Sequence, residues 1–209
     1  MSDALFSNRR TLLLAGLAAL SLAGCDSPMS PAVKFNGVDI TGADYARKLD
    51  LPDFDGRPRA LADFKGKVVF VFFGFTQCPD VCPTTMAELA QVKKRLGADG
   101  ERVQGVFVTV DPERDTPEVL KAYITAMDPS FLALRGTLAQ TEALGREFKV
   151  FYQKVPTKNG NYTMDHTAGA FVFDPDGHVR LFVRYGIGVE ALTSDIRQLL
   201  AQSPAKVSG

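Results

Sequence analysis

The fold is decided by the run KVVFVFFGF at residues 67–75, which is apolar throughout after its lysine. A continuous apolar run of this length is typical of a strand buried on both faces. We therefore expect residues 67–75 to form the central strand of a sheet. The next residues, TQCPDVCP at 76–83, hold two cysteines four positions apart, where the strand is expected to give way to a helix.

Helices and strands alternate along the rest of the chain. The periodicity predicts helices over 83–96, 116–127, 139–148 and 190–201, strands over 103–110, 150–155, 167–173 and 179–185, and a polar loop at 157–161. The sequence DPDG at 174–177 is typical of a tight turn between antiparallel strands. This order indicates an α/β fold, a thioredoxin-like central mixed sheet with flanking helices and a C-terminal antiparallel hairpin.

The N-terminal residues indicate export. Two arginines precede an apolar run at 12–22, which is too short for a spanning helix, and small residues lead to Cys25. The sequence LAGC at 22–25 resembles the lipobox of bacterial lipoproteins. The resemblance implies cleavage before Cys25 and acylation of its sulfur, with an uncleaved signal anchor as the alternative. Asp26 resembles the signal that keeps some lipoproteins in the inner membrane.

The net charge of the chain gives no reason to expect nucleic acid as a partner. Removing residues 1–24 leaves 22 basic and 23 acidic side chains, and this near-neutral balance gives no indication of nucleic-acid binding.

We divide the chain into a lipoprotein signal peptide (1–24), a tether (25–34), one thioredoxin-like domain (35–203) and a flexible tail (204–209).

Cys78 and Cys82 follow the central strand, at the edge where open α/β sheets bind ligands. With Pro83 at the first helical position, Cys82 is expected to cap the helix and Cys78 to lie in the preceding loop. The positive field of the helix end favours thiolates there. Two such sulfurs can close a disulfide or hold one soft metal ion. A purely structural disulfide of an exported protein is the alternative.

The chain has two histidines, His166 and His178, that could supply a third ligand. They are expected at opposite ends of one strand, so both cannot reach the cysteines. A strand antiparallel to the central strand would begin at the cysteine edge, and His166 is expected to begin that strand. We therefore assign His166 to the site and expect His178 to be exposed. Two thiolates and an imidazole suit copper, whereas zinc usually takes a fourth ligand.

Three segments resemble the signature of the SCO/SenC family of copper-binding, thioredoxin-like proteins. They are FGFTQCPDVCPTT at 73–85, VDPERDTP at 110–117 and DHT at 165–167. The resemblance extends over residues 51–200 and departs at Phe75, where the family often has tyrosine, a change not expected to touch the chemistry.

The resemblance implies a metallochaperone that helps to assemble the dinuclear copper centre of cytochrome c oxidase subunit II. Its copper ligands, carried over by position, are Cys78, Cys82 and His166, and another periplasmic protein could act as copper donor. With the lipid anchor, the expected location is the periplasmic face of the inner membrane in the bacterial envelope. Oxidation of the two cysteines to a disulfide would abolish metal binding.

Peroxidase activities of related folds do not match the sequence. Thiol peroxidases have proline and threonine where this chain has Val71 and Phe75, and glutathione-peroxidase-like enzymes use a tryptophan, which is absent here. A thiol-disulfide reductase that keeps partner cysteines reduced remains open, as does a redox or copper sensor. We expect ligand exchange in preference to enzymatic turnover.

Acidic residues lie near the predicted site. The loop 111–115 is expected to be solvated, with Asp115 or Thr116 capping the next helix, or to form a docking surface for a partner or for incoming copper. Asp165 could orient His166, although neighbouring side chains on a strand point to opposite faces. Asp80 could tune the thiolates or shape the turn.

Overall fold

The computed structural model describes residues 34–158 and 160–202 of the 209-residue chain. The chain divides into two compact units, residues 1–34 and 35–209, and nearly all described residues belong to the second. The predicted signal peptide, Cys25, most of the tether and the tail lie outside the described residues. Within the described ranges, no helix is long and apolar enough to cross a membrane.

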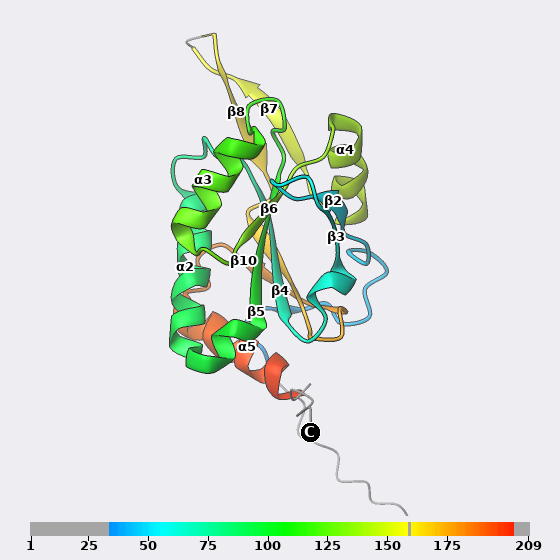
Figure 1. Cartoon of the computed structure of the whole chain (residues 1–209), viewed down its shortest axis with the longest axis vertical. Helices are drawn as coiled ribbons and strands as arrows, with labels where there is room; N and C mark the ends of the chain where they lie inside the picture. Colours follow the sequence, from blue (N-terminus) through cyan, green and yellow to red (C-terminus); the bar gives the residue numbers. More distant parts are fainter. Residues whose placement is uncertain (1–33, 159, 203–209) are drawn as a thin grey trace, which may run out of the picture. The chain divides into compact units, whose positions relative to one another are not determined.

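A six-stranded mixed sheet forms the centre of the second unit, in the order β1-β10-β9-β4-β5-β6 (Figure 1). The parallel strands are β4 (Val68–Gly74), β5 (Val103–Thr109) and β6 (Leu132–Leu134). Each neighbour pair among β4, β9, β10 and β1 is antiparallel, and the last three span Gly169–Phe173, Val179–Arg184 and Val38–Asp39. Every residue of β4 is buried, which confirms the predicted central strand.

The described residues form four α-helices that flank this sheet. They are α2 (Val81–Leu96), α3 (Pro117–Met127), α4 (Leu138–Glu147) and α5 (Val189–Gln202). Figure 1 shows α2, α3 and α5 on one side of the sheet and α4 on the other. Two short 3₁₀ helices, η1 (Leu61–Phe64) and η2 (Gly97–Arg102), precede β4 and β5. The helix ends agree with the predicted ones to within about two residues, the scatter normal for such boundaries.

Two small antiparallel pairs lie outside the central sheet. One joins β2 (Asp50–Pro52) to β3 (Pro58–Ala60), and the other joins β7 (Tyr152–Pro156) to β8 (Tyr162–His166). Strand β8 was not predicted, because its sequence YTMDH lacks a continuous apolar run. It corrects the expectation that His166 begins the strand of residues 167–173: His166 ends β8, and β9 begins at Gly169.

The hairpin of β9 and β10 matches the prediction. The backbone N–H of Asp174 donates to the carbonyl of His178 at 2.9 Å, and Gly177 has a φ of +88°, which glycine adopts without strain. Strand β9 runs antiparallel to β4, so Ala170 lies opposite Phe72 and Phe173 lies opposite Val69. The start of β9 therefore lies at the C-terminal end of β4, where the cysteines follow.

Aromatic side chains fill the core between α4 and the sheet. Phe148, which follows α4, is fully buried, and its ring centroid lies 5.1 Å from those of Phe73 and Phe171 and 6.2 Å from that of Phe173. The same residue therefore contacts both β4 and β9. Aromatic contacts of this kind stabilise the fold beyond the effect of the apolar area that they bury.

We expect Phe148→Ala to lower the free energy of unfolding by about 3–5 kcal/mol, because it leaves a cavity between β4, β9 and α4. Urea unfolding measures this change. The matched control is Phe151→Ala three residues on, where the ring is 59% exposed and the expected loss is at most about 0.5 kcal/mol. Equal losses from the two variants would contradict this account of the core.

Candidate metal centre

Cys78, Cys82 and His166 meet beyond the C-terminal end of β4. Their two Sγ atoms and the nearest ring nitrogen of His166 all lie within 4.8 Å of one another. Cys82 is buried, whereas Cys78 and His166 are partly exposed. The structure thus brings together the three residues that the sequence analysis selected. His178, by contrast, lies at the turn after β9, with its side chain 78% exposed, as predicted.

Helix α2 begins two residues earlier than predicted. Its N-cap is Asp80 and its first residue is Val81, so Cys82 is the second helical residue and not the cap. Pro83 still lies in the first turn, where its missing N–H removes no helical hydrogen bond. The backbone N–H of Cys82 points to the Sγ of Cys78 at 3.4 Å. Asp80 makes no side-chain cap bond, and its carboxylate accepts a hydrogen bond from the Thr84 hydroxyl at 3.3 Å.

Gly74, the last residue of β4, makes room for the Cys82 side chain. A Cβ atom at Gly74 would lie 2.9 Å from the Cys82 Sγ and 2.9 Å from the Phe107 ring, closer than real Cβ contacts. Only glycine therefore lets the thiol pack directly on the strand backbone. Sequence analysis did not assign this role to Gly74, although a glycine that interrupts an apolar strand is a signal of close approach.

Protonation at Cys82 differs from the expectation. Burial raises the pKa of this thiol well above its usual value, and the hydrogen bond with Cys78 adds to the increase. The expected thiolate is therefore wrong for Cys82 in the metal-free protein, because burial outweighs the field of the helix end. Both cysteines are free thiols in this structure. A metal ion at this site must displace the proton of Cys82.

The imidazole of His166 is held with one nitrogen free to coordinate. Nδ1 lies 3.1 Å from the carbonyl oxygen of Thr167, and because that oxygen can only accept, Nδ1 carries the proton. Nε2 is then unprotonated and lies 3.5 Å from the Cys82 Sγ. Burial lowers the pKa of His166, which keeps the ring neutral. Neutral imidazole is the form that binds metals.

Two phenylalanines fix the plane of this ring. Phe72 and Phe75 both contact His166 edge to face, with ring centroids 5.9 Å away. Phe75 was expected to have no bearing on the chemistry, yet it forms one wall of the histidine pocket. Asp165 is exposed, and the Thr167 carbonyl occupies the position at Nδ1 that Asp165 was considered for.

The three donor atoms fit one metal ion. Metal bonds of about 2.3 Å to thiolate and about 2.0 Å to imidazole place the ligand atoms of a trigonal site roughly 4 Å apart. The observed upper limit of 4.8 Å is close to that separation. Two sulfurs and one imidazole are also soft ligands, which suit copper better than they suit hard cations.

Both aspartates of the loop between β5 and α3 are buried, where a solvated loop was expected. Asp111 and Asp115 are 1% and 0% exposed, while Thr116 caps α3 as predicted by accepting from the Val119 N–H. The Asp115 carboxylate accepts hydrogen bonds from the backbone N–H and hydroxyl of Thr76 and from the Thr109 hydroxyl. Burial raises the pKa of Asp115, against the effect of these hydrogen bonds. The loop therefore supports the segment that carries Cys78.

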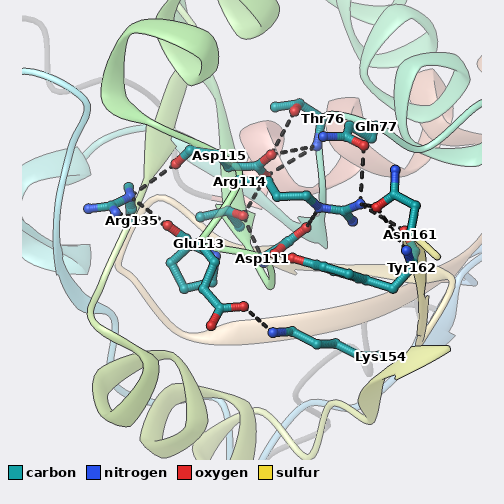
Figure 2. A network of polar contacts seen from close by, with 12 residues as sticks. Thr76, Gln77, Asp111, Glu113, Arg114, Asp115, Arg135, Lys154, Asn161 and Tyr162 are labelled. Carbon is teal, nitrogen blue, oxygen red and sulfur yellow. Dashed lines mark hydrogen bonds and ion pairs between the residues drawn. The ribbon is translucent and has the colours of Figure 1, made fainter. Parts of the chain in front are cut away.

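A polar network extends from this loop to the β7–β8 hairpin (Figure 2). Its members include Arg114, Arg135 and Tyr162, which the sequence analysis did not single out. The only signal in the sequence was an acidic and basic loop directly after a buried strand at the functional edge. Their partners come from segments far apart in the chain, so no local pattern could identify them.

Comparisons with known proteins agree with this geometry. A family model described as SCO1/SenC matches residues 39–201. The curated "Protein SCO2 homolog, mitochondrial" of Mus musculus is 36% identical over 156 residues, or 73% of this chain and 61% of the relative. The "Putative copper-binding protein" of Stutzerimonas stutzeri is 32% identical over 154 residues, or 73% of this chain and 76% of the relative. The chain thus spans about three fifths of the mouse relative's length.

Solved structures agree as well. The ScoI of Bradyrhizobium japonicum, described with copper bound, is 38% identical with a TM-score of 0.67, covering 73% of this chain and 98% of that one. The apo Sco1 of Thermus thermophilus is 38% identical with a TM-score of 0.72, covering 82% of this chain and all of that one. The thioredoxin-like α/β fold expected from the sequence is therefore confirmed. With its family model matched over residues 39–201, the chain belongs to the SCO1/SenC family.

Proposed function

We propose that this protein holds one copper ion between Cys78, Cys82 and His166 and delivers it to subunit II of cytochrome c oxidase, for the assembly of that subunit's dinuclear copper centre. The observation that carries the proposal is the convergence of two thiols and an unprotonated imidazole nitrogen within 4.8 Å. Relatives described with copper bound, from Bradyrhizobium japonicum and yeast, support the choice of metal. A further solved neighbour, BsSco, is described as a member of the Sco family of cytochrome c oxidase assembly proteins.

Copper is the cargo in this proposal, and delivery is an exchange of ligands. Loading removes the protons of the thiols, and release returns them, so transfer is coupled to proton uptake. Thiolates favour Cu(I), while the imidazole also suits Cu(II). Incoming ligands of the partner would approach between Cys78 and His166, the two partly exposed members of the site.

A thiol-disulfide reductase is the second candidate, and the two free thiols favour it. Attack by Cys78 on a partner disulfide would form a mixed disulfide, and Cys82 would then resolve it, leaving an oxidised Cys78–Cys82 pair and a reduced partner. Cys78 is partly exposed, which suits an attacking thiol. The raised pKa of Cys82 makes this cysteine less well suited to the resolving step. Such a reductase has no need of His166, which is the reason for ranking it second. A redox or copper sensor would use the same thiols.

We also propose that Cys25 carries the lipid that anchors the protein to the periplasmic face of the inner membrane. Support comes from the LAGC sequence at 22–25 and from a solved neighbour described as a SCO1/SenC family lipoprotein of Bacillus anthracis, 27% identical with a TM-score of 0.60. A donor of copper to this protein would then be another periplasmic protein.

Replacing Cys78 or Cys82 with serine is expected to abolish stoichiometric copper binding, because a hydroxyl is a poor ligand for Cu(I). His166→Ala should weaken Cu(II) binding by roughly 10- to 100-fold or more, judging from the loss found when metal-site partners are removed. Metal analysis and competition titrations of the reduced protein measure both effects. His178→Ala is the matched control and should bind as the unaltered protein does. Full copper loading of Cys78→Ser would refute the ligand assignment.

A bacterial strain that carries His166→Ala with both cysteines intact separates the two candidate functions. Copper delivery predicts that this strain loses oxidase assembly at limiting copper, as Cys82→Ser does, because the third ligand is missing. The assay is oxidase activity and subunit II copper content in isolated membranes. Normal assembly in His166→Ala alongside failure in Cys82→Ser would support the reductase.

Mass spectrometry of the protein from a native-like host is expected to find acylated Cys25 as the first residue. Cys25→Ser should leave the signal peptide uncleaved and unacylated. Recovery of an unmodified Cys25 within an intact N-terminal segment would instead identify an uncleaved signal anchor.

A further inference from the structure

The strand that carries His166 is not part of the central sheet. β7 and β8 pair only with each other among the described strands, and Figure 1 shows them extending beyond the end of the central sheet. The base of the hairpin is tied by the Thr167 N–H, which donates to the Phe151 carbonyl at 2.9 Å. The distance between His166 and the cysteines therefore depends on the two-residue link from His166 to β9 and on side chains that join the hairpin to the rest of the domain.

Arg114 makes that connection on the side of the cysteines (Figure 2). Its Nη1 donates to the carbonyl of Tyr162 at 2.7 Å and to the Asn161 side chain at 3.4 Å, both on the hairpin. The same nitrogen donates to the Gln77 side chain at 3.1 Å, next to Cys78 in sequence. The guanidinium also lies over the Tyr162 ring, 3.7 Å from its centroid. One side chain thus contacts the cysteine loop and the strand of His166.

Contacts with a buried carboxylate hold the guanidinium of Arg114 in place. Its Nε pairs with the carboxylate of Asp111, whose side chain is fully buried, while that of Arg114 is 15% exposed. The Tyr162 hydroxyl donates to the same carboxylate at 2.9 Å. Arg135 fixes the loop by donating to the carbonyls of Pro112 and Asp115. A rigid planar fork in a site of low dielectric makes strong, directional bonds.

The remaining nitrogen of Arg114 takes no part in these contacts. Nη2 is buried without a hydrogen-bond partner in the part of the chain that the structure describes. Buried donors are nearly always paired, and an unpaired one calls for an explanation. Here Tyr162 and Asp111 set the plane of the guanidinium, and this orientation leaves Nη2 without a hydrogen-bond partner.

We propose that Arg114 is a positioning residue, which clamps the β7–β8 hairpin to the cysteine loop and so sets His166 at coordinating distance from Cys78 and Cys82. The inference rests on the proposed copper function, and adds to it a residue that touches no ligand atom. Without the clamp, Cys82 keeps its place on α2 and Cys78 its place in the loop between β4 and α2, while the hairpin and His166 move more widely. Binding that needs the imidazole is then weakened more than binding that needs only the thiols.

The chain supplies a matched control at the same contact. Glu113 and Lys154 form an ion pair between the same loop and the same hairpin, but both side chains are nearly half exposed. Exposed ion pairs contribute little to stability. Glu113→Gln therefore removes a charge bridge between these segments and leaves Arg114, Asp111 and Tyr162 in place.

Two variants test the clamp. Arg114→Lys keeps a charge beside Asp111, but a single ammonium cannot reach Gln77 and Tyr162 together or stack as a planar group. The double variant Arg114→Met/Asp111→Asn removes the pair without leaving a buried charge unpaired. Hydrogen exchange of the full-length, metal-free, reduced protein is followed by mass spectrometry, with β4 as the internal reference for global stability. Cu(II) loading is followed by electron paramagnetic resonance, which reports nitrogen coordination.

In both variants, amides of β7 and β8 should exchange at least about tenfold faster while β4 keeps its protection. Cu(II) affinity should fall by roughly 10- to 100-fold, the loss typical of residues that orient a ligand. The nitrogen signal should approach that of His166→Ala, and Cu(I) affinity should change less. Glu113→Gln should match the unaltered protein in every measurement.

Three outcomes overturn the proposal: unchanged exchange of the hairpin, equal loss of protection in β4 and the hairpin, or an unchanged nitrogen signal and Cu(II) affinity. The exchange measurement needs no copper, so it tests the clamp even if the copper function fails. Conversely, copper loading of Cys78→Ser would refute the proposed function and leave the exchange result intact.

Discussion

The pairing of β9 with β4 is the constraint on which the site depends. The cysteines follow β4, and His166 precedes β9, so an antiparallel pair is the arrangement that brings both to one edge of the sheet. Cys82 and His166 are 84 residues apart in sequence, yet their side chains lie 3.5 Å apart. A parallel β9 would place His166 at the opposite end of β4, a full strand length away. Both strands are buried at every position, so apolar burial stabilises this pairing along the whole of β9.

Close packing behind Cys82 gives the site its chemical character. Gly74 admits the sulfur against the strand, and the surrounding apolar side chains raise the pKa of the thiol. A buried thiol that keeps its proton is a poor nucleophile and is slow to oxidise. In the metal-free protein, Cys82 is therefore protected against oxidation. Its deprotonation becomes favourable when a cation is present to replace the proton.

Much of this arrangement was predictable from the sequence, for physical reasons that also explain the failures. The long apolar runs predicted β4 and β5, helical periodicity predicted α2, and simple topology selected His166 over His178. The start of α2 was misplaced because proline is accepted at several positions of a first turn, so Pro83 alone could not fix the cap. Strand β8 was missed because three of its five residues are polar and its partner is a single short strand. The burial of Asp111 and Asp115 was missed because their partners, Tyr162 and Thr76, are 51 and 39 residues away.

In the copper delivery that we propose, unequal burial of the three donors sets an order for ligand exchange. Cys82 lies at the back of the site on a rigid helix, while Cys78 lies in a loop and His166 on a hairpin outside the main sheet. A partner's ligand can approach only from the side of Cys78 and His166, so these two bonds are the ones that new ligands displace first. The hairpin pairs with no strand of the central sheet, whereas moving Cys82 would require α2 to separate from β4. Loss of the Cys82 bond is therefore the last step of the proposed release, and the raised pKa of Cys82 favours proton uptake by the freed thiolate.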